Sequence, residues 1–179
     1  DEHPRASTTL EALAKLKPVV TAEGTVTAGN ASGINDGAAA VLIASEQAIQ
    51  QYQLKPRAKI IASTAVGVEP RIMGFAPAPA IKKLLKQANL TIEQMDVIEL
   101  NEAFAAQALA VTRDLGLADD TTQVNPNGGA IAIGHPLGAS GARLVTTALN
   151  QLEQTGGTYA LCSMCIGVGQ GIAMIIQRV

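Results

Sequence analysis

Three short motifs in the second half of the chain set polar side chains in apolar or glycine-rich surroundings: Asn101-Glu102-Ala103-Phe104, Gly134-His135-Pro136 and Cys165-Ile166-Gly167. The whole sequence has only two histidines and two cysteines, so one of each in such a setting calls for an explanation. An imidazole and a thiol can both exchange protons, and a thiol can also act as a nucleophile. The motifs together suggest thiol and carbonyl chemistry.

His135 follows a glycine-rich loop and is itself followed by Pro136. Glycines let the backbone approach a ligand closely, and a helix expected to begin near Gly138 presents free N–H groups to the same region. The alternative is an ordinary surface histidine, but the glycine-rich setting just before a helix favours a functional one. A P-loop is excluded because the Gly-Lys-Ser/Thr ending is missing.

Cys165 ends an expected strand and precedes three glycines at every second position, Gly167, Gly169 and Gly171. These glycines leave one face of the turn bare, with N–H groups accessible to an oxyanion, which favours a catalytic thiol. Cys162 is better explained as a small buried hydrophobic residue. Residues three apart on a strand point to opposite faces, so a disulfide between the two cysteines would be strained, and redox and metal roles are disfavoured.

Asn101 lies where a short apolar strand over 97–100 turns into a helix. Ligands of α/β proteins usually bind at such strand ends. The alternative is that Asn101 only caps the helix, which asparagine does well. Combined with the other two motifs, Asn101 is interpreted as part of one site.

The elements that must position these residues alternate along the chain. We expect strands over 58–68, 97–100, 158–165 and 170–177. We expect helices over 8–17, 46–52, 79–88, 102–115 and 139–154, with Ser45 capping the second and a glycine-rich loop over 126–138. The apolar run over 37–44 could be a strand or a helix. This alternation predicts a layered α/β fold with a mixed sheet, closed by an antiparallel hairpin.

Composition narrows the class of protein. Hydrophobic residues make up 47% of the 179 residues, enough for a substantial core. A net charge of −2 and a pI near 5.7 argue against a nucleic-acid-binding surface. No apolar run approaches the roughly 20 residues that span a bilayer. The start, Asp1-Glu2-His3-Pro4-Arg5, has no initiator Met and no signal-peptide pattern, so we expect a piece of a longer protein.

Four motifs, in this order, resemble the thiolase family: Asn30-Ala31-Ser32-Gly33 with Asp36-Gly37, then 101–104, 134–136 and 165–167. The resemblance covers essentially the whole chain. It implies an acyltransferase that performs thiolysis of a 3-ketoacyl-CoA or the reverse Claisen condensation of two acyl-CoAs. It also implies the thiolase-like α/β fold, with a mixed five-stranded sheet, helices on both faces and the element order βαβαβαββ. Residues 1–30 would end the loop domain, 31–56 the amino-terminal half, and 57–179 would form the carboxyl-terminal half.

The resemblance also assigns roles to single residues. Cys165 matches the acid/base cysteine, His135 the histidine that activates the acyl-accepting cysteine and helps to bind the thioester oxygen, and Asn101 the residue that positions a water there. The backbone N–H of Gly167 matches a donor of the second oxyanion hole. Three further residues match positions that contact CoA or the acyl group: Ser32, Met73 and Phe104.

The nucleophilic cysteine of the family has no counterpart here, because no cysteine occurs before Cys162. We therefore expect the isolated chain to be inactive and the complete protein to be the enzyme. The resemblance implies no cofactor, CoA as a substrate, acyl-CoA and the missing amino-terminal half as partners, and a homo-oligomer (dimer or tetramer). It implies no nucleic acid, metal or membrane span, a cytoplasmic location and a role in fatty acid metabolism.

Two alternatives remain at this point. A ketoacyl synthase-like condensing enzyme resembles a Cys-His-His set, whereas only one glycine-flanked histidine occurs here. A non-catalytic thiolase-like protein that binds acyl-CoA or lipid would not need an acid/base cysteine. The retention of Asn101, His135 and Cys165 together argues against that second alternative.

Overall fold

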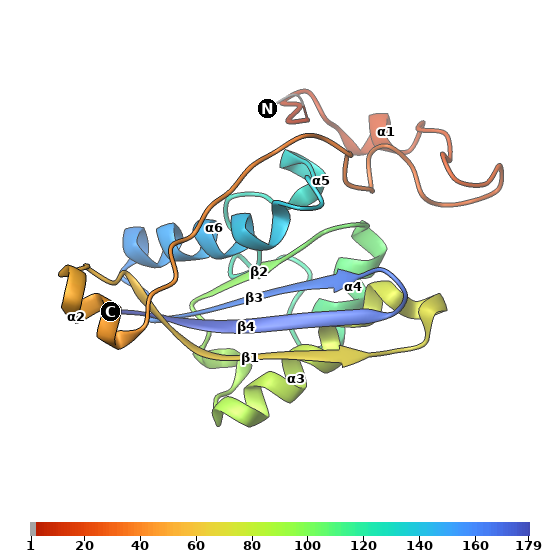
Figure 1. Cartoon of the computed structure of the whole chain (residues 1–179). Coiled ribbons are helices and arrows are strands. Elements are labelled where there is room, and N and C mark those ends of the chain that lie inside the picture. Colours follow the sequence, from red (N-terminus) through yellow and green to blue (C-terminus); the bar gives the residue numbers. More distant parts are fainter. Residues whose placement is uncertain (1–2) are drawn as a thin grey trace.

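The computed structural model describes residues 3–179. Asp1 and Glu2, with which the expected connector begins, lie outside the described residues. Four strands form one sheet in the order β1-β4-β3-β2 (Figure 1). Their bounds are Ala58–Gly67 for β1, Val97–Leu100 for β2, Tyr159–Ile166 for β3 and Gln170–Arg178 for β4. β2 and β3 pair in parallel, while β4 pairs antiparallel with both β1 and β3, so the mixed sheet and the closing hairpin are confirmed.

The sheet has four strands in the part of the chain that the structure describes, so the prediction of a five-stranded sheet is wrong. A single parallel bridge between Ile98 and Val124 takes the place of a fifth strand beside β2. It consists of two hydrogen bonds, from Ile98 N to Gln123 O and from Asn125 N to Ile98 O, both 2.9 Å long. The pairing stops there because Asn125 has a left-handed φ of 48° and Pro126, which follows, has no N–H to donate.

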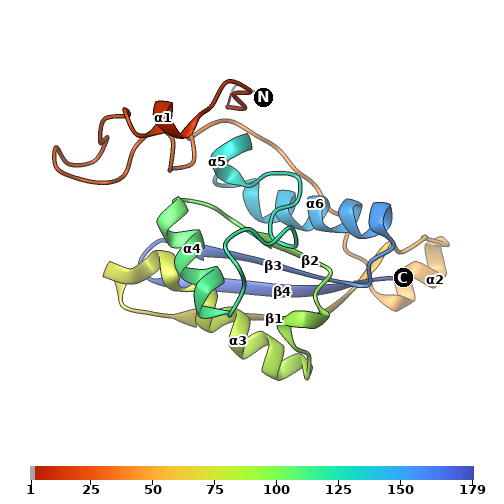
Figure 2. The ribbon, with the colours of Figure 1, turned by 180° about the vertical axis from the view of Figure 1, so that it is seen from behind.

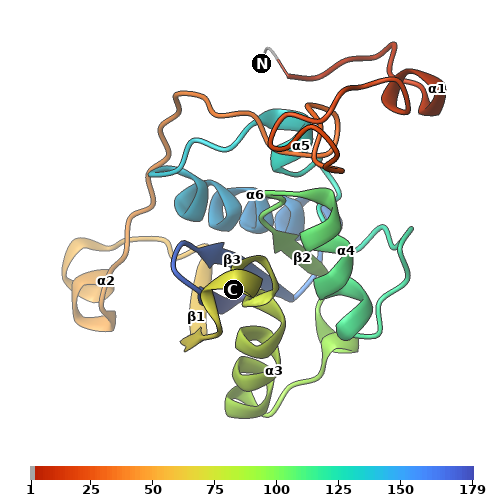
Figure 3. The ribbon, with the colours of Figure 1, turned by 90° about the vertical axis from the view of Figure 1, so that its right-hand side faces the viewer.

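Helices cover both faces of the sheet, as predicted (Figures 1 and 3). α3 (Pro77–Ala88) and α4 (Ala105–Asp114) lie on one face, and α6 (Ser140–Thr155) lies on the other. α6 places Leu144, Ala148 and Leu152 on one stripe because residues four apart share a face of a helix. That stripe packs against the chain's own sheet, where Val97 and Ala160 belong to the same buried cluster.

Two buried apolar clusters join the layers. The larger one lies between the sheet and the pair α3 and α4, and includes Ile81, Leu84, Met95, Ile98, Leu100, Val111, Leu161 and Ile175. The smaller one lies beneath α6 and consists of Val97, Leu144, Ala148, Leu152, Ala160, Cys162 and Ile176. β2 is therefore covered on both faces, and all four of its residues are buried, whereas β1 buries none.

Residues 3–57 contain only two short helices, α1 (Leu10–Leu13) and α2 (Glu46–Tyr52), joined by a long extended segment (Figure 2). The expected helix over 8–17 is thus shorter than predicted, whereas the helix after Ser45 is confirmed, with the Ser45 hydroxyl accepting from Ala48 N at 3.1 Å. The run over 37–44 is neither a helix nor a paired strand. No residue from 3 through 75 is buried.

Three short elements complete the chain: η1 (Pro70–Phe75), η2 (Ile92–Gln94) and α5 (Ala130–Ile133). η1 follows β1 and packs against β3, β4 and α4. α5 interrupts the loop that was expected to be irregular over 126–138. Across residues 3–179, the helices are all too short or too polar to cross a membrane.

Candidate active site

Asn101 follows β2 directly and is fully buried. Its backbone N–H donates to Ser163 O at 3.0 Å, which extends the pairing between β2 and β3 by one step. Its side-chain Nδ2 lies 3.2 Å from Nε2 of His135, which is 34 residues away in sequence. The prediction that these two motifs meet in one place is therefore correct.

His135 is held in position by its backbone and by its ring. Its N–H donates to Gly33 O at 2.9 Å, and its Nδ1 lies 2.6 Å from the hydroxyl of Ser140 at the start of α6. Gly134, just before it, ends α5 with a φ of 93°, and a Cβ there would lie 2.3 Å from Asn35 Oδ1. Only glycine fits this position, so the glycine-rich sequence lets the loop pack closely against the extended segment.

Cys165 lies near the carboxyl end of β3, beyond Ser163, which is the residue that pairs with Asn101. It therefore comes close to the same edge of the sheet as Asn101. Its cross-strand neighbour Gly171 packs so tightly against Ala76 that an added Cβ would lie 2.4 Å from Ala76 O. Side chains directly opposite each other on paired strands share a face, so the thiol of Cys165 lies on the η1 side of the sheet.

Cys162 has the opposite orientation and is part of the cluster beneath α6. Both cysteines are free thiols and both are buried. The sequence-based interpretation of Cys162 as a buried hydrophobic residue is thus consistent with its packing.

Gly167 begins the tight turn that joins β3 to β4, and it is exposed. Val168 has a φ of 70° and Gly169 a φ of 91°. Gly169 accepts a hydrogen bond from Val68 N, and a Cβ on Gly169 would lie 2.3 Å from Val68 O. The turn is therefore pressed against the chain that leaves β1, and a branched residue such as Val168 has a strained conformation beside Gly167.

The extended segment reaches the site at residues 30–33. Ala31 forms a bridge with Phe104, Ser32 N donates to Ala103 O at 3.0 Å, and Ala105 N donates to Asn30 O at 2.8 Å. Ser32 therefore lies beside the loop that carries Asn101, while its neighbour Gly33 contacts His135.

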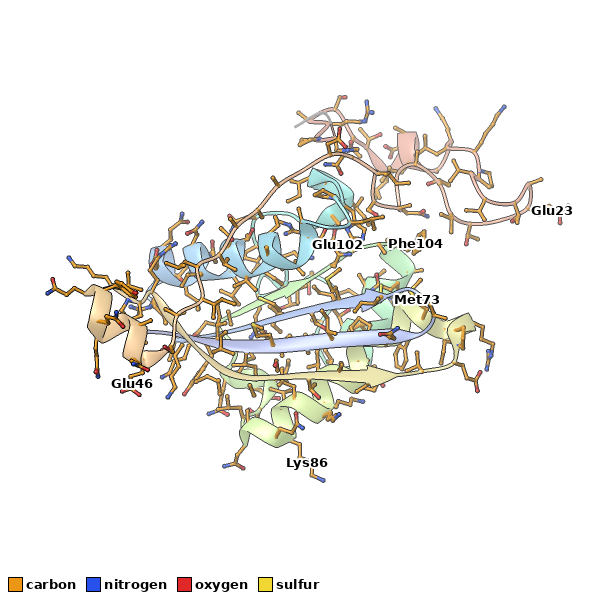
Figure 4. The ribbon with its side chains drawn as sticks, in the orientation of Figure 1. Glu23, Glu46, Met73, Lys86, Glu102 and Phe104 are labelled. Carbon is orange, nitrogen blue, oxygen red and sulfur yellow. The ribbon has the colours of Figure 1, made fainter. Side chains whose placement is uncertain are left out.

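Met73 lies in η1, which packs against α4 and β3. Figure 4 shows Met73 and Phe104 near the same end of the sheet, toward which β3 runs. Phe104 is the residue just before α4 and is about one-third exposed, at 36%. All seven residues predicted for the site thus lie toward the carboxyl ends of β2 and β3 or on segments packed there.

Burial shifts the acid–base groups of the site. It is the main cause that lowers the pKa of His135 below its usual 6.5, and the nearby charge of Arg143 lowers it further. Burial likewise raises the pKa of the Cys165 thiol, partly offset by a hydrogen bond to its own backbone. At neutral pH the imidazole is therefore neutral and the thiol is protonated. A thiolate base would need a lowered thiol pKa, and in this chain the pKa of Cys165 is shifted in the other direction.

Two supporting features were not predicted from the sequence. Glu102 accepts from Asn125 Nδ2 at 2.6 Å and from Ile131 N at 3.2 Å, which ties the loop after β2 to α5. Glu99, fully buried on β2, forms an ion pair with Arg143 Nη1 at 3.2 Å. A glutamate within the apolar run of β2 was the one signal in the sequence that could have revealed this pair.

The Glu99–Arg143 pair lies next to the site in sequence, since Glu99 precedes Asn101 by two residues and Arg143 follows Ser140 by three. Burial raises the pKa of Glu99 to about 7, opposed by the attraction of Arg143 and assisted by the repulsion of Glu102. Within residues 3–179 there is no cluster of three or more His, Cys, Asp or Glu side chains that could hold a metal ion. The arrangement offers a neutral base, a protonated thiol and amide donors, which suit acyl transfer and proton transfer at a carbon.

Comparisons with known proteins agree with this geometry. The family models for the thiolase C-terminal and N-terminal domains match residues 54–178 and 1–47. The β-ketoadipyl-CoA thiolase of Acinetobacter baylyi is 87% identical over all 179 residues, which correspond to 45% of that protein. The chain therefore spans less than half the length of this relative.

Two solved structures superpose on the whole chain. The Bacillus anthracis acetyl-CoA acetyltransferase matches with a TM-score of 0.94 at 45% identity, and the chain covers 45% of it. Human mitochondrial 3-ketoacyl-CoA thiolase in complex with CoA matches with a TM-score of 0.90 at 48% identity, again over 45% of its length. On these matches and the motifs that carry them, the chain belongs to the thiolase family.

Proposed function

We propose that the complete protein is an acyltransferase that cleaves a 3-oxoacyl-CoA by thiolysis, and that this chain supplies the proton-transfer groups. The observation that carries the proposal is the contact between Asn101 and His135 at the carboxyl end of β2, close to Cys165. A protein that only binds acyl-CoA has no need for a base and a thiol acid at one strand end.

His135 is the base that prepares the acyl acceptor. Its neutral Nε2 takes the proton of an acyl-accepting thiol, which lies outside this chain, and the resulting thiolate attacks the 3-oxo carbon. The protonated ring then donates a hydrogen bond to the thioester oxygen. Asn101 lies beside Nε2, where it positions a water for the same oxygen.

Cys165 transfers the proton to carbon. Cleavage of the carbon–carbon bond releases an acyl-CoA enolate, and the protonated thiol of Cys165 donates its hydrogen to the α-carbon. The Cys165 thiolate then takes the proton of CoA, whose sulfur attacks the acyl-enzyme, and the released acceptor thiolate takes its proton back from His135. A thiol whose pKa is raised is in the protonated form that is required at the start of cleavage. The Gly167 N–H donates to the oxyanion that forms on the 3-oxo oxygen when the thiolate attacks.

Ser32, Met73 and Phe104 bind the CoA and acyl parts of the substrate. Their place near the same sheet edge supports this assignment, as does the human relative that was solved with CoA. The steps above move protons and an acyl group without a redox change, so CoA enters as a substrate and no cofactor is required.

The substrate proposed for the complete protein is 3-oxoadipyl-CoA, whose acyl group ends in a carboxylate. The name of the Acinetobacter baylyi relative supports this choice, whereas the family resemblance alone implied a role in fatty acid metabolism. The homo-oligomeric state, dimer or tetramer, and the cytoplasmic location remain predictions.

Turnover with 3-oxoadipyl-CoA and acetoacetyl-CoA, each with CoA, tests the proposal when product esters are separated by chromatography. We expect the complete protein to cleave 3-oxoadipyl-CoA faster than acetoacetyl-CoA, and the isolated 179-residue chain to cleave neither, because covalent catalysis needs the missing acceptor. Failure of the complete protein to cleave either ester would refute the function. Turnover by the isolated chain would refute the division of roles.

A further inference from the structure

Ser140 is the first residue of α6 and is fully buried, and its hydroxyl has two partners. Its Oγ lies 2.6 Å from His135 Nδ1 and 3.0 Å from the carbonyl oxygen of Pro136. Neither the motifs nor the family resemblance assigned this residue a role.

The hydroxyl hydrogen of Ser140 is donated to Pro136 O, four residues earlier in the chain. Hydroxyls on helices commonly donate in this way, and the same helix repeats the pattern at Thr146, which donates to Ala142 O at 2.9 Å. A hydroxyl has one hydrogen and two acceptor lone pairs. The short contact with His135 is therefore a bond in which the ring Nδ1–H donates to Ser140.

We propose that Ser140 is a positioning residue that holds His135 in the Nδ1–H tautomer, with Nε2 bare toward Asn101. The hydrogen bonds then run in one direction, from Asn101 Nδ2–H to His135 Nε2, from His135 Nδ1–H to Ser140 Oγ, and from Ser140 O–H to Pro136 O. Each nitrogen of a neutral imidazole has only one of the two roles, so fixing Nδ1 as a donor fixes Nε2 as an acceptor.

The consequence for catalysis rests on the proposed function. A base that accepts a proton from the acyl-accepting thiol must present a bare nitrogen to it, and Ser140 supplies that condition from the far side of the ring. The proton moves from the thiol sulfur to the single lone pair of Nε2, which releases the hydrogen bond from Asn101, while Nδ1 keeps its own hydrogen and its bond to Ser140. The Pro136 carbonyl at the end of the row of hydrogen bonds then helps to stabilise the imidazolium.

The tautomer can be read directly by multiple-bond ¹H–¹⁵N spectroscopy of the complete protein labelled at histidine. Spectra at pH 8 report the neutral ring, and the His135 signals are those that disappear in His135→Asn. We expect the parent and Ser140→Thr, which keeps a hydroxyl, to show a protonated Nδ1 and a bare Nε2. In Ser140→Ala the two nitrogen shifts should move toward each other as the tautomers mix.

The kinetic effect provides a second readout. We expect Ser140→Ala to lower kcat by about 10–100-fold, the size of effect that the loss of an outer hydrogen-bond partner has on metal-ligating histidines, with KM changed less than about threefold. Ser140→Thr should recover most of kcat. Thr146→Ala is the matched control, because its hydroxyl makes the same helix bond without a bond to His135, and it should match the parent in both readouts.

An Nε2–H tautomer in the parent protein would overturn the proposal, even if no variant folds. A tautomer that does not change in folded Ser140→Ala would overturn it as well. A changed tautomer in a complete protein that cleaves no 3-oxoacyl-CoA would leave the positioning role intact and refute the proposed function instead.

Discussion

Two four-residue, mainly apolar segments of this chain differ in whether their side chains are buried. Val97–Leu100 forms β2, and all four of its residues are buried between α6 and the pair α3 and α4. Ala40–Ile43 is extended but unpaired, with Leu42 83% and Ile43 71% exposed. β2 has the backbone of β3 beside it, whereas the described residues offer no such neighbour to 40–43. An apolar segment is therefore buried only where other elements both pair with it and pack on its faces, as β3, α6, α3 and α4 do for β2.

The same contrast holds for whole regions. Residues 3–57 bury none of their side chains, while residues 58–179 contain the sheet and both clusters. The two family domains divide the chain in nearly the same place, at 47 and 54. Residues 30–33 are the part of the first region that is hydrogen-bonded to the site, through Ser32 and Gly33.

A matched pair of leucine truncations gives the largest expected difference between the regions. Leu84→Ala removes a fully buried side chain from the larger cluster and should lower the free energy of unfolding by about 2–5 kcal/mol. Leu42→Ala removes an exposed one and should change it by less than about 0.5 kcal/mol. Denaturant titration of the 179-residue chain measures both. Equal effects would mean that residues 40–43 are packed in solution.

The buried Glu99–Arg143 pair should make the free energy of unfolding depend on pH. The pKa of Glu99 is raised to about 7 from 4.5 by burial, so the folded state binds more protons than the unfolded state between these values. Stability should therefore fall as pH rises from about 4.5 through about 7, by at most about 3 kcal/mol. The lowered pKa of His135 acts in the opposite sense, decreasing stability as pH falls below 6.5.

Glu99→Gln isolates the contribution of Glu99, because the difference between its unfolding profile and that of the parent cancels the effect of His135. We expect the parent to lose stability relative to Glu99→Gln as pH rises from 5 to 8. Glu46→Gln, on the exposed helix α2, is the control and should follow the parent. A difference profile that is flat, or that slopes the other way, would show that Glu99 is ionised at low pH.

Much of the fold could be predicted because its signals are local. The apolar strands and the Ser45 cap each depend on a few neighbouring residues, and the structure contains them. The grouping of Asn101 and Cys165 could also be predicted, because parallel strands place their carboxyl ends at one edge.

The remaining features depend on contacts between distant parts of the chain. Only a single bridge forms where a fifth strand was expected, because Asn125 has a left-handed backbone conformation and Pro126 follows it. The pattern of apolar residues gives no sign of this backbone conformation. The Glu99–Arg143 pair joins residues 44 apart. The role proposed for Ser140 depends on which neighbouring atom accepts its hydroxyl hydrogen. The positions of the atoms decide this, and the residue type does not.

In the proposed mechanism Cys165, and not its neighbour Cys162, transfers the proton to carbon. Cys165→Ser and Cys162→Ser in the complete protein test this role directly, with thermal melting to confirm that each variant folds. We predict that Cys165→Ser slows cleavage by about 10²–10⁴-fold, because a hydroxyl is a far weaker acid than a thiol. Cys162→Ser should change cleavage by less than about threefold. Cleavage by Cys165→Ser within about twofold of the parent would contradict the claim.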